Sequence, residues 1–377
     1  MSVRAWRGRR WPLAELWLWG PAAVLIAIGV LSVYAATRNG LLSAGRPGTD
    51  YLKRDLLNAL VAAAVAVPLS RQDYRQLRAL SPLVYGGLTV LLLAVLSPLG
   101  STINGAHAWF SLGPAQFEPS EFMKLGLLLL LAALLSERRD REDSPGRAQV
   151  LWGLGVAGLP TLLVLAEPAL GIAIVLVVIT LSLLAISGVP ARVVSGLIAG
   201  VVVGGALAFG LHLLKPYQEQ RFTAFTDAAA ASHTTAGYQM KQSLIAIGSG
   251  GLTGQGFLAG SQTDGGFVPE EQTDFVFTVS AEEGGLVTGS VLLIALGVLL
   301  LHGLRVAQYA PDLFGRLLAG GVVMWLAFQS FVNIGMTLGI TPVTGLPLPF
   351  VSYGGSSVLA DLLAVAVLVS IKRSSAP

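Results

Sequence analysis

Four places in the sequence set charged or hydroxyl side chains inside or beside long apolar segments. An ionised side chain in the middle of a membrane helix costs about 2.5–3.5 kcal/mol on insertion scales. Ionisable residues in such places are therefore candidates for function. The four places are Lys53-Arg54, Pro119–Lys124, Val268–Phe277 and Leu346–Ser357.

The segment Pro119-Ser-Glu121-Phe-Met-Lys124 opens an apolar run. Glu121 and Lys124 are three residues apart, so they share one face of a helix, and Pro119 suits its first turn. Two interpretations stay open. The two side chains form a structural ion pair inside the membrane, or they form a polar wall that faces a charged substrate.

The segment Val268–Phe277 leads into another apolar run. Thr273 or Asp274 could simply cap the helix, because a short side-chain oxygen satisfies free backbone N–H groups there. Alternatively, Asp274 is a carboxylate at the membrane surface with a raised pKa, and it serves as a general base. Glu282 follows two turns deeper and about 80° around the helix, so it could line the same cavity.

The remaining two places carry weaker signals. Leu346–Ser357 combines prolines, the pair Gly354-Gly355 and hydroxyl side chains. It is a closely packed helix start, or it presents Ser356 to a substrate. Lys53 and Arg54 are anchors whose charged ends reach the membrane surface, or a clamp for an anionic head group.

The composition requires a membrane around these residues. Of 377 residues, 54% are hydrophobic and 12% are charged, whereas an ordinary soluble domain has about 25% charged residues. Water-soluble globules, disordered chains, collagen and coiled coils are excluded, and a net charge of +3 does not indicate a nucleic-acid partner. A membrane-spanning helix needs about 20 apolar residues. The apolar runs lie at 17–36, 56–70, 82–98, 119–136, 149–166, 168–187, 190–214, 275–303, 315–340 and 351–371.

We therefore predict an all-α, polytopic integral membrane protein with about ten transmembrane helices. Most Lys and Arg residues fall in connections that share one side of the membrane with the N-terminus. The positive-inside rule then places both termini in the cytoplasm, with 1–16 as a cytoplasmic N-terminal segment. The first run is a retained anchor helix, because no small-residue cleavage site follows it.

One connection, residues 215–273 between the seventh and eighth runs, is exceptionally long. The orientation makes it a large extracytoplasmic loop. Residues 238–247 alternate polar and apolar faces, which predicts an interfacial or re-entrant helix followed by a flexible glycine turn at 248–256.

Several familiar sites are missing from the sequence. The chain has no cysteine, so disulfides, iron–sulfur clusters and thiol catalysis are excluded. The glycines at 248–256 match neither a dinucleotide fold nor a P-loop. No Lys follows a Ser by three residues, so the Ser-x-x-Lys acyl-enzyme motif is absent. The four His residues are scattered, without metal-ligand spacing.

In several segments the chain resembles the SEDS family of membrane peptidoglycan polymerases, which includes the RodA and FtsW branches. The matching segments are Ile103–Trp109, Pro119–Lys124, Gln242–Gly251, Pro269–Phe277 with Glu282-Glu283, and Pro347–Ser357. The resemblance implies an inverting glycosyltransferase in the bacterial cytoplasmic membrane. Such an enzyme joins lipid II units into glycan strands at the outer face and releases undecaprenyl pyrophosphate. The segment Leu346–Tyr353 favours the RodA branch, which acts in elongation and rod shape, over the FtsW division branch.

The resemblance also implies roles for individual residues. Asp274 matches the catalytic Asp, Glu121 and Lys124 match a polar pair facing the same cavity, and Arg54 matches a basic position. Ala169 stands where the family usually has Asp, which puts any role of the turn at 167–169 in doubt. The family further implies a partner, a class B penicillin-binding protein that crosslinks the strands.

These residues fit glycan extension on chemical grounds as well. Our hypothesis is that Asp274 takes a proton from the attacking sugar hydroxyl, while Glu121 and Lys124 set its pKa and orient the substrate. Lys124, Arg54 and Arg221 could offset the charge that develops on the pyrophosphate. A Mg²⁺ or Mn²⁺ ion held by Asp274 or Glu121 could do the same.

Three other functions are considered. A lipid II flippase or transporter would also use intramembrane charges, but it should carry polar groups through the midplane. An FtsW-like division polymerase shares the chemistry. A non-enzymatic scaffold would tolerate neutral residues at Glu121 and Asp274. We expect residues 1–377 to form a single domain.

Overall fold

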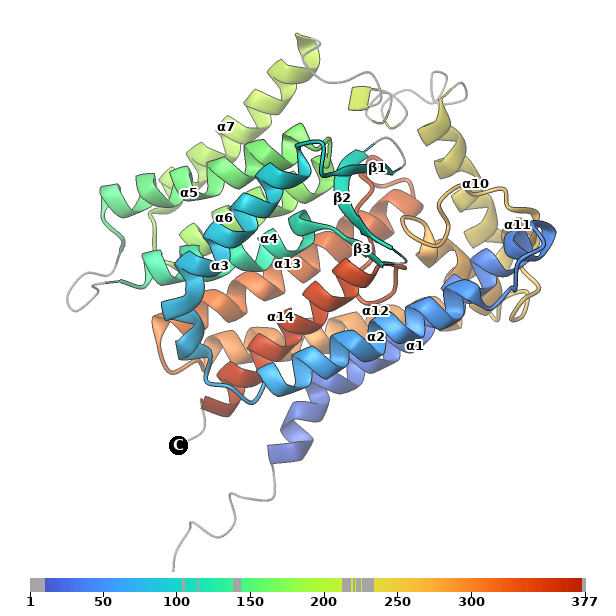
Figure 1. Cartoon of the computed structure of the whole chain (residues 1–377), viewed down its shortest axis with the longest axis horizontal. Helices are drawn as coiled ribbons and strands as arrows, with labels where there is room; N and C mark the ends of the chain where they lie inside the picture. The colour runs from blue at the N-terminus through green and yellow to red at the C-terminus, as the bar shows by residue number, and fades with distance from the viewer. Residues whose placement is uncertain are drawn as a thin grey trace, which may run out of the picture.

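The computed structural model describes residues 11–103, 106–113, 115–137, 144–211, 218–219, 221, 225 and 234–374. Each of the ten apolar runs becomes a helix (Figure 1). These helices are α1 (Trp11–Ser43), α2 (Asp50–Leu69), α3 (Tyr74–Val95), α4 (Pro119–Leu135), α5 (Arg147–Ala166), α6 (Leu170–Ile186), α7 (Ala191–Gly210), α12 (Val276–Gln308), α13 (Leu313–Thr337) and α14 (Gly355–Ser374). Most of the predicted segment 1–16 and much of 215–233 lie outside the described residues.

The protein is an all-α polytopic membrane protein with one small addition. Within the described residues, seven helices are long and apolar enough to cross a membrane, namely α1, α3, α5, α7, α12, α13 and α14. The apolar helix α6 is shorter, so the count of ten spans stays a prediction. The addition is an unexpected antiparallel sheet between α3 and α4, formed by β1 (Ser101–Ile103), β2 (Ala106–Leu112) and β3 (Ala115–Phe117).

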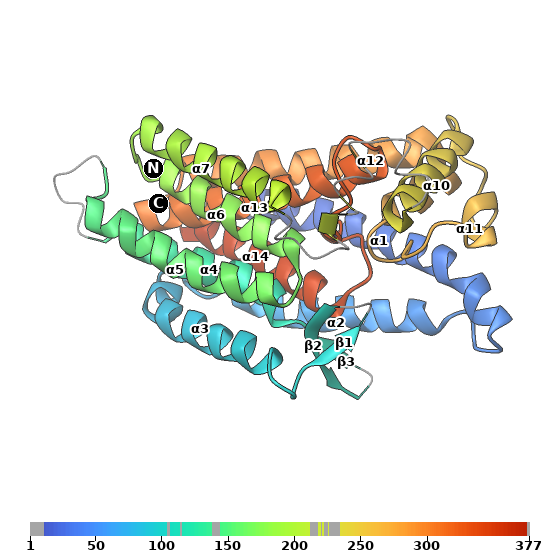
Figure 2. The same ribbon diagram turned by 90° about the horizontal axis from the view of Figure 1, so that it is seen from above.

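The helices form a bundle around four central members, α4, α6, α13 and α14, whose residues are mostly buried. Helix α12 packs between α1 and α13, while α2 lies along α14 and α3 along α4 (Figures 1 and 2). Helix α7 packs on α6 at the edge of the bundle, and none of its residues is buried. Helices at the centre thus have protein on every side, and α7 has the exposure expected of a lipid-facing helix.

The first and last helices meet at one end of the bundle. Arg373 near the end of α14 donates to Glu15 near the start of α1, at 2.7 Å. The starts of α3 and α13 lie at the same end, because Tyr74 contacts both Ser370 and Asp312. We call this the terminal end. The opposite end, the loop end, carries β1–β3, residues 338–354 and the part of the long loop from 234 to 273 (Figure 2).

Two helices form inside the described part of the long loop, α10 (Thr235–Gly250) and α11 (Ser261–Gly265). The helix expected at 238–247 is therefore confirmed as a helix. Thr234 caps α10 by accepting from the backbone N–H of Gly237 at 3.1 Å. Helix α12, in contrast, has Phe275 as its N-cap and no side-chain cap bond. The interpretation of Thr273 or Asp274 as a plain cap is therefore wrong, and the carboxylate of Asp274 is left for other contacts.

Helix α12 is broken at Gly285, whose backbone has φ +64° and ψ −161°. This conformation is essentially restricted to glycine. The glycine-rich turn after α10 takes up the freed backbone groups. Gln255 N–H donates to Glu282 O at 2.9 Å, and Leu286 N–H donates to Gly251 O at 3.0 Å. The turn that the sequence suggested as flexible is thus held by α12 through main-chain hydrogen bonds.

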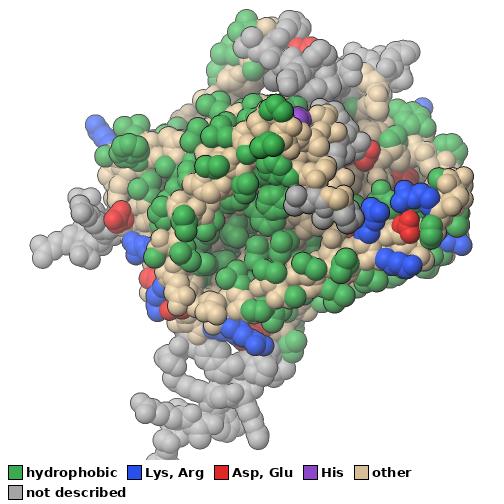
Figure 3. All heavy atoms as spheres, in the orientation of Figure 1, with side chains coloured by type: hydrophobic (Ala, Val, Ile, Leu, Met, Phe, Trp, Pro, Cys, Tyr) green, Lys and Arg blue, Asp and Glu red, His purple; other side chains and the backbone are tan. Residues whose placement is uncertain are grey.

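The surface has the pattern that a bilayer demands. Figure 3 shows apolar side chains across the middle of one face, with charged side chains gathered toward its margins. Large apolar residues on the outer helices are exposed, among them Leu60 of α2, Leu83 of α3 and Val202 of α7. In water such a surface would drive aggregation, whereas acyl chains cover it at no cost.

Candidate active site

Asp274 lies at the loop end, directly before the first residues of α12. Asp274 as a whole residue is half-buried, whereas the next residue, Phe275, is fully buried. Asn333 of α13 fixes the backbone here, because its amide donates both to Asp274 O at 2.9 Å and to Leu346 O at 2.7 Å. One side chain therefore holds the start of α12 and the segment before α14 in register.

Arg221 and Asp274 converge on Gly345. A Cβ atom added to Gly345 would lie 3.1 Å from Arg221 Nη1 and 3.5 Å from Asp274 Oδ2. Gly345 also has φ +74°, a backbone conformation that favours glycine. The structure thus brings together two predicted site residues that are far apart in the chain.

Burial raises the pKa of Asp274 to about 6, while the positive charge of Arg221 works against this rise. The carboxyl group is therefore mostly ionised at neutral pH, yet it is a stronger proton acceptor than an ordinary aspartate. Those are the properties required of a general base that works near pH 7.

Residues Gly345–Tyr353, which we call the 345–353 segment, form the wall beside Asp274. Ser352 Oγ donates to Thr273 O at 2.5 Å, and Tyr353 N–H donates to Gln272 O at 2.9 Å. The segment is thus bonded to the two residues that precede Asp274. A shift of the segment would therefore move Gln272 and Thr273 as well.

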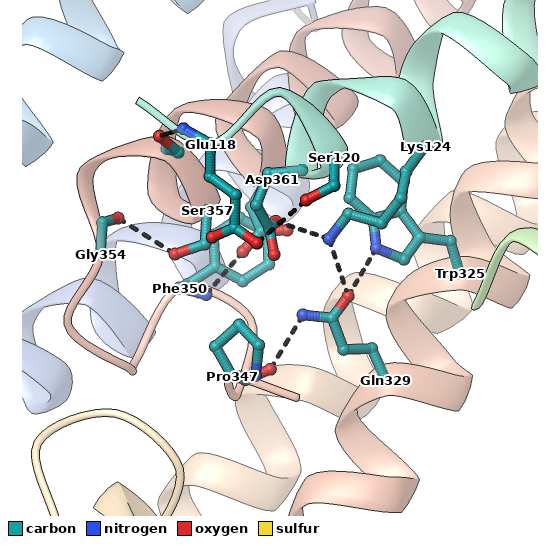
Figure 4. Close-up of polar contacts among 12 residues, drawn as sticks. Glu118, Ser120, Lys124, Trp325, Gln329, Pro347, Phe350, Gly354, Ser357 and Asp361 are labelled. Carbon is teal, nitrogen blue, oxygen red and sulfur yellow. Dashed lines mark hydrogen bonds and ion pairs between the residues drawn. The ribbon is translucent and has the colours of Figure 1, made fainter. Parts of the chain in front are cut away.

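The predicted Glu121–Lys124 pair is present and deeply buried. Lys124 Nζ lies 2.6 Å from Glu121 Oε2, and the two side chains are 0% and 2% exposed. Lys124 also donates to Gln329 Oε1 at 3.1 Å and sits 4.6 Å from the centre of the Trp325 ring (Figure 4). Because no face of Lys124 is open in this conformation, the pair has the geometry of an intramembrane ion pair.

The pair is nevertheless connected to the wall of the site. Gln329 accepts from Lys124 and Trp325, and its amide donates to Pro347 O at 2.9 Å (Figure 4). Pro347 belongs to the 345–353 segment. Two hydrogen bonds therefore connect Lys124 through Gln329 to the segment beside Asp274.

Other predicted site residues have anchoring contacts. The Glu282 carboxylate accepts from Gln262 N at 2.7 Å and from Thr263 Oγ1 at 2.7 Å, so it holds α11. Ser356 Oγ accepts from Glu118 N at 3.0 Å, which ties α14 to the start of α4.

Arg54, another predicted site residue, is exposed on α2 and interacts with the hydroxyl of Tyr353. Unlike Glu282 and Ser356, it is placed to meet a ligand from outside.

Three carboxylates in this region were missed in the sequence. Glu118 precedes α4, and burial together with the charge of Glu121 raises its pKa to about 8. Burial likewise raises the pKa of Glu167 to about 8, with help from Glu118. Both oxygens of Glu167 lack a partner among the described residues. The third is Asp361 of α14, which is 1% exposed. Each borders or interrupts an apolar run, and that signal could have singled them out.

The described residues do not form a protein-only metal site. No group of three or more His, Asp or Glu side chains among them could hold a metal ion. The two suggested ligands also face cations already, since Glu121 pairs with Lys124 and Asp274 lies near Arg221. An ion at either carboxylate would have to compete with a side-chain positive charge.

The fold defines a polytopic membrane protein whose loop end brings Asp274 and Arg221 together. Residues 16–376 match the family model of the FtsW, RodA and SpoVE cell cycle proteins. The chain belongs to this family.

Three relatives illustrate the similarity. The chain is 37% identical over 353 residues to the peptidoglycan glycosyltransferase MrdB of Escherichia coli K12, covering 93% of this chain and 92% of MrdB. A chain from a peptidoglycan synthase complex that coordinates polymerization and crosslinking is 32% identical, with a TM-score of 0.75 over 95% of this chain and 97% of that one. The Thermus thermophilus rod shape determining protein RodA is 31% identical, with a TM-score of 0.68 over 99% of both chains.

Proposed function

We propose that the protein is a peptidoglycan glycosyltransferase of the RodA type, which polymerises lipid II during cell elongation. One observation carries the chemical part of this proposal. Asp274 is a carboxylate with a pKa of about 6 that shares the space around Gly345 with the guanidinium of Arg221. The similarity to MrdB and to RodA favours this function over the division branch.

Asp274 acts as the general base. It takes the proton from a sugar hydroxyl of one lipid-linked saccharide as that oxygen attacks the anomeric carbon of the other. The bond from this carbon to the pyrophosphate oxygen breaks, the configuration inverts, and undecaprenyl pyrophosphate leaves. A correctly placed base contributes about 10²–10⁴-fold to the rate of such a step.

The leaving pyrophosphate needs positive charge nearby. Arg221 and Arg54 are candidates for direct contact, because Arg221 borders Asp274 and Arg54 is exposed on α2. Lys124 is fully buried and bonded to Glu121 and Gln329. We assign it a supporting role, in which it sets the local field and holds the 345–353 segment through Gln329.

A divalent cation would add charge stabilisation if it were bound. Mg²⁺ is usually held by one or two carboxylates together with substrate phosphates, so the described residues alone need not form a cage. Asp274 and Glu121 are each near a cation, which makes them poor ligands in this conformation. Arg221 and Arg54 would then share the stabilisation of the pyrophosphate with the ion.

We further propose that the loop end faces the outside of the bacterial cytoplasmic membrane, that both termini are cytoplasmic, and that the chain is one domain. The distribution of Lys and Arg supports this orientation. The contact between Arg373 and Glu15 supports the placement of both termini on the same side of the membrane.

The proposed function also needs a place for the lipid tails and a protein partner. Helices α2 and α3 diverge around α14 and α4 and expose apolar residues such as Leu57 and Val90, which suits isoprenoid chains (Figure 1). The proposed partner is a class B penicillin-binding protein. The relative from a complex that coordinates polymerization with crosslinking supports such a partner. The missing Ser-x-x-Lys motif also fits transpeptidation on another chain.

The purified protein in detergent, mixed with labelled lipid II with and without Mg²⁺ or Mn²⁺, tests the activity. We expect long glycan strands and free undecaprenyl pyrophosphate. A lipid II transporter would instead move the label across vesicle membranes without making strands. Absence of strands under all three conditions would overturn the proposal.

A further inference from the structure

Asp361 is an acidic residue within a membrane helix that the mechanism above does not use. It lies in the second turn of α14, and the residues on either side, Ala360 and Leu362, are buried and apolar. Its own side chain is 1% exposed. A carboxylate in such a place is costly and needs an explanation.

Its contacts point in two directions. Asp361 Oδ2 accepts from the backbone N–H of Phe350 at 3.1 Å. On the other side lie the charged groups of α4, with Lys124 attracting the carboxylate and Glu121 repelling it. Figure 4 shows Asp361 between Phe350 and Lys124. Its second oxygen, Oδ1, has no hydrogen-bond partner among the described residues.

The contact with Phe350 fixes an unusual point of the backbone. Phe350 has φ +66°, a left-handed conformation that bulky residues rarely adopt without support. It is the turning point of the 345–353 segment. Two residues later, Ser352 and Tyr353 bond to Thr273 and Gln272.

Two routes therefore lead from Lys124 to the wall of the active site. One runs through Gln329 to Pro347. The other passes Asp361, which lies in the field of Lys124 and holds Phe350 by accepting from its backbone N–H. Both end on the 345–353 segment, and Asn333 then bridges Leu346 to Asp274.

We infer that Asp361 is a positioning residue for the proposed glycosyl transfer, which holds the Phe350 turn so that Asp274 keeps its place beside Arg221. It acts through the 345–353 segment and does not touch the substrate. The inference rests on the proposed function, and it adds a residue that links the buried Glu121–Lys124 pair to the base.

Two substitutions separate the hydrogen bond from simple packing. Asp361→Asn keeps an oxygen that accepts from Phe350 N–H, so turnover should stay within about threefold of wild type. Asp361→Leu has a similar size but no acceptor, so kcat should fall about 10- to 100-fold while KM for lipid II stays nearly constant. Asp361→Ala serves if leucine prevents folding.

Hydrogen–deuterium exchange gives a readout that needs no catalysis. In Asp361→Leu, exchange should increase in peptides covering 345–353 and 270–275, and Asp361→Asn should restore protection. Ser370→Ala is the matched control, because it removes bonds to Tyr74 N and Gln72 O at the terminal end of the same helix. It should leave kcat and the exchange of both peptides unchanged.

Three results would overturn the inference. They are a wild-type kcat in Asp361→Leu, an equal loss in Asp361→Asn and Asp361→Leu, or unchanged exchange at 270–275 in Asp361→Leu. If the wild-type protein makes no strands, the proposed function fails, whereas the exchange experiment still decides whether Asp361 positions the segment around Asp274.

Discussion

At the scale of single residues, the reactivity of Asp274 comes from a balance between burial and one cation. An aspartate in water has a pKa near 3.9 and is a weak base. Burial raises the value here to about 6, and Arg221 limits the rise. Without Arg221 the pKa of Asp274 would be higher and less of the carboxyl would be ionised at neutral pH, whereas without burial the pKa would be lower and Asp274 a weaker proton acceptor.

This balance predicts the pH dependence of turnover. The base must be ionised, so kcat/KM should increase with pH and level off above about 6, the pKa of Asp274. Arg221→Met removes a charge that lowers this pKa, so the rise of kcat/KM should occur at higher pH. Arg221→Lys keeps the charge, so the rise should occur near the wild-type pH. A pH profile of Arg221→Met that equals the wild-type profile would contradict this electrostatic coupling.

The buried ion pair gives a second residue-level prediction. Lys124→Met leaves the Glu121 carboxylate without its partner, which typically costs about 3–5 kcal/mol of stability. The double variant Glu121→Gln/Lys124→Met removes both charges and should recover most of the loss in thermal unfolding. We expect its turnover to stay at least tenfold low, because the field beside the site is gone. Wild-type turnover in the double variant would mean that the pair is purely structural.

At the scale of elements, the broken helix α12 connects the membrane bundle to the loop that carries Asp274. Gly285→Ala should destabilise the protein by about 1–3 kcal/mol, because alanine does not tolerate this backbone conformation. The added methyl would also collide with the backbone of Leu252 and Gly254. Gly297→Ala is the control in the same helix, since nothing lies within 4 Å of its Cβ position. It should be neutral or stabilising, and equal melting temperatures for the two variants would contradict the role of the break.

Much of the element pattern was predictable, for a simple reason. Lipid leaves a spanning segment few choices besides an apolar helix, so the ten runs in the sequence identify ten helices. The small sheet β1–β3 was missed because its strands have three to seven residues and little alternation. The break at Gly285 was missed because one glycine in an apolar run is common, and its partner loop ends about 30 residues earlier in the chain, a separation typical of tertiary contacts rather than local ones.

The site was predictable only in part. Asp274 and the Glu121–Lys124 spacing stand out locally, but the meeting of Arg221, Gly345 and Asp274 depends on how three distant segments fold. Asp361 was overlooked because it is a single charge in the middle of the apolar run 351–371, whereas the other candidate residues lie near the ends of such runs. Glu282 was expected near Asp274 from helical geometry, yet the loop supplies α11 as its partner.

At the scale of the whole molecule, the bundle separates two polar ends by an apolar middle (Figure 3). The terminal end joins α1 to α14, and the loop end holds the site. In the proposed function, this arrangement lets a lipid-linked sugar reach Asp274 with its tail still in the bilayer.

The orientation can be read directly, because the chain has no cysteine of its own. Ala259→Cys, on an exposed part of the loop end, should react with an impermeant maleimide added to intact spheroplasts. Ser374→Cys, at the terminal end, should react only after the membrane is opened. The opposite pattern would place the site in the cytoplasm and contradict polymerisation at the outer face.

The most direct test of the central claim is the turnover of Asp274→Asn with labelled lipid II. The account predicts that the rate of strand synthesis falls about 10²–10⁴-fold, while the melting temperature stays close to wild type. Asp264→Asn is the matched control, since Asp264 belongs to the same loop but contacts Asn39, and it should polymerise normally. Wild-type strand synthesis by Asp274→Asn would show that this carboxylate is not the base.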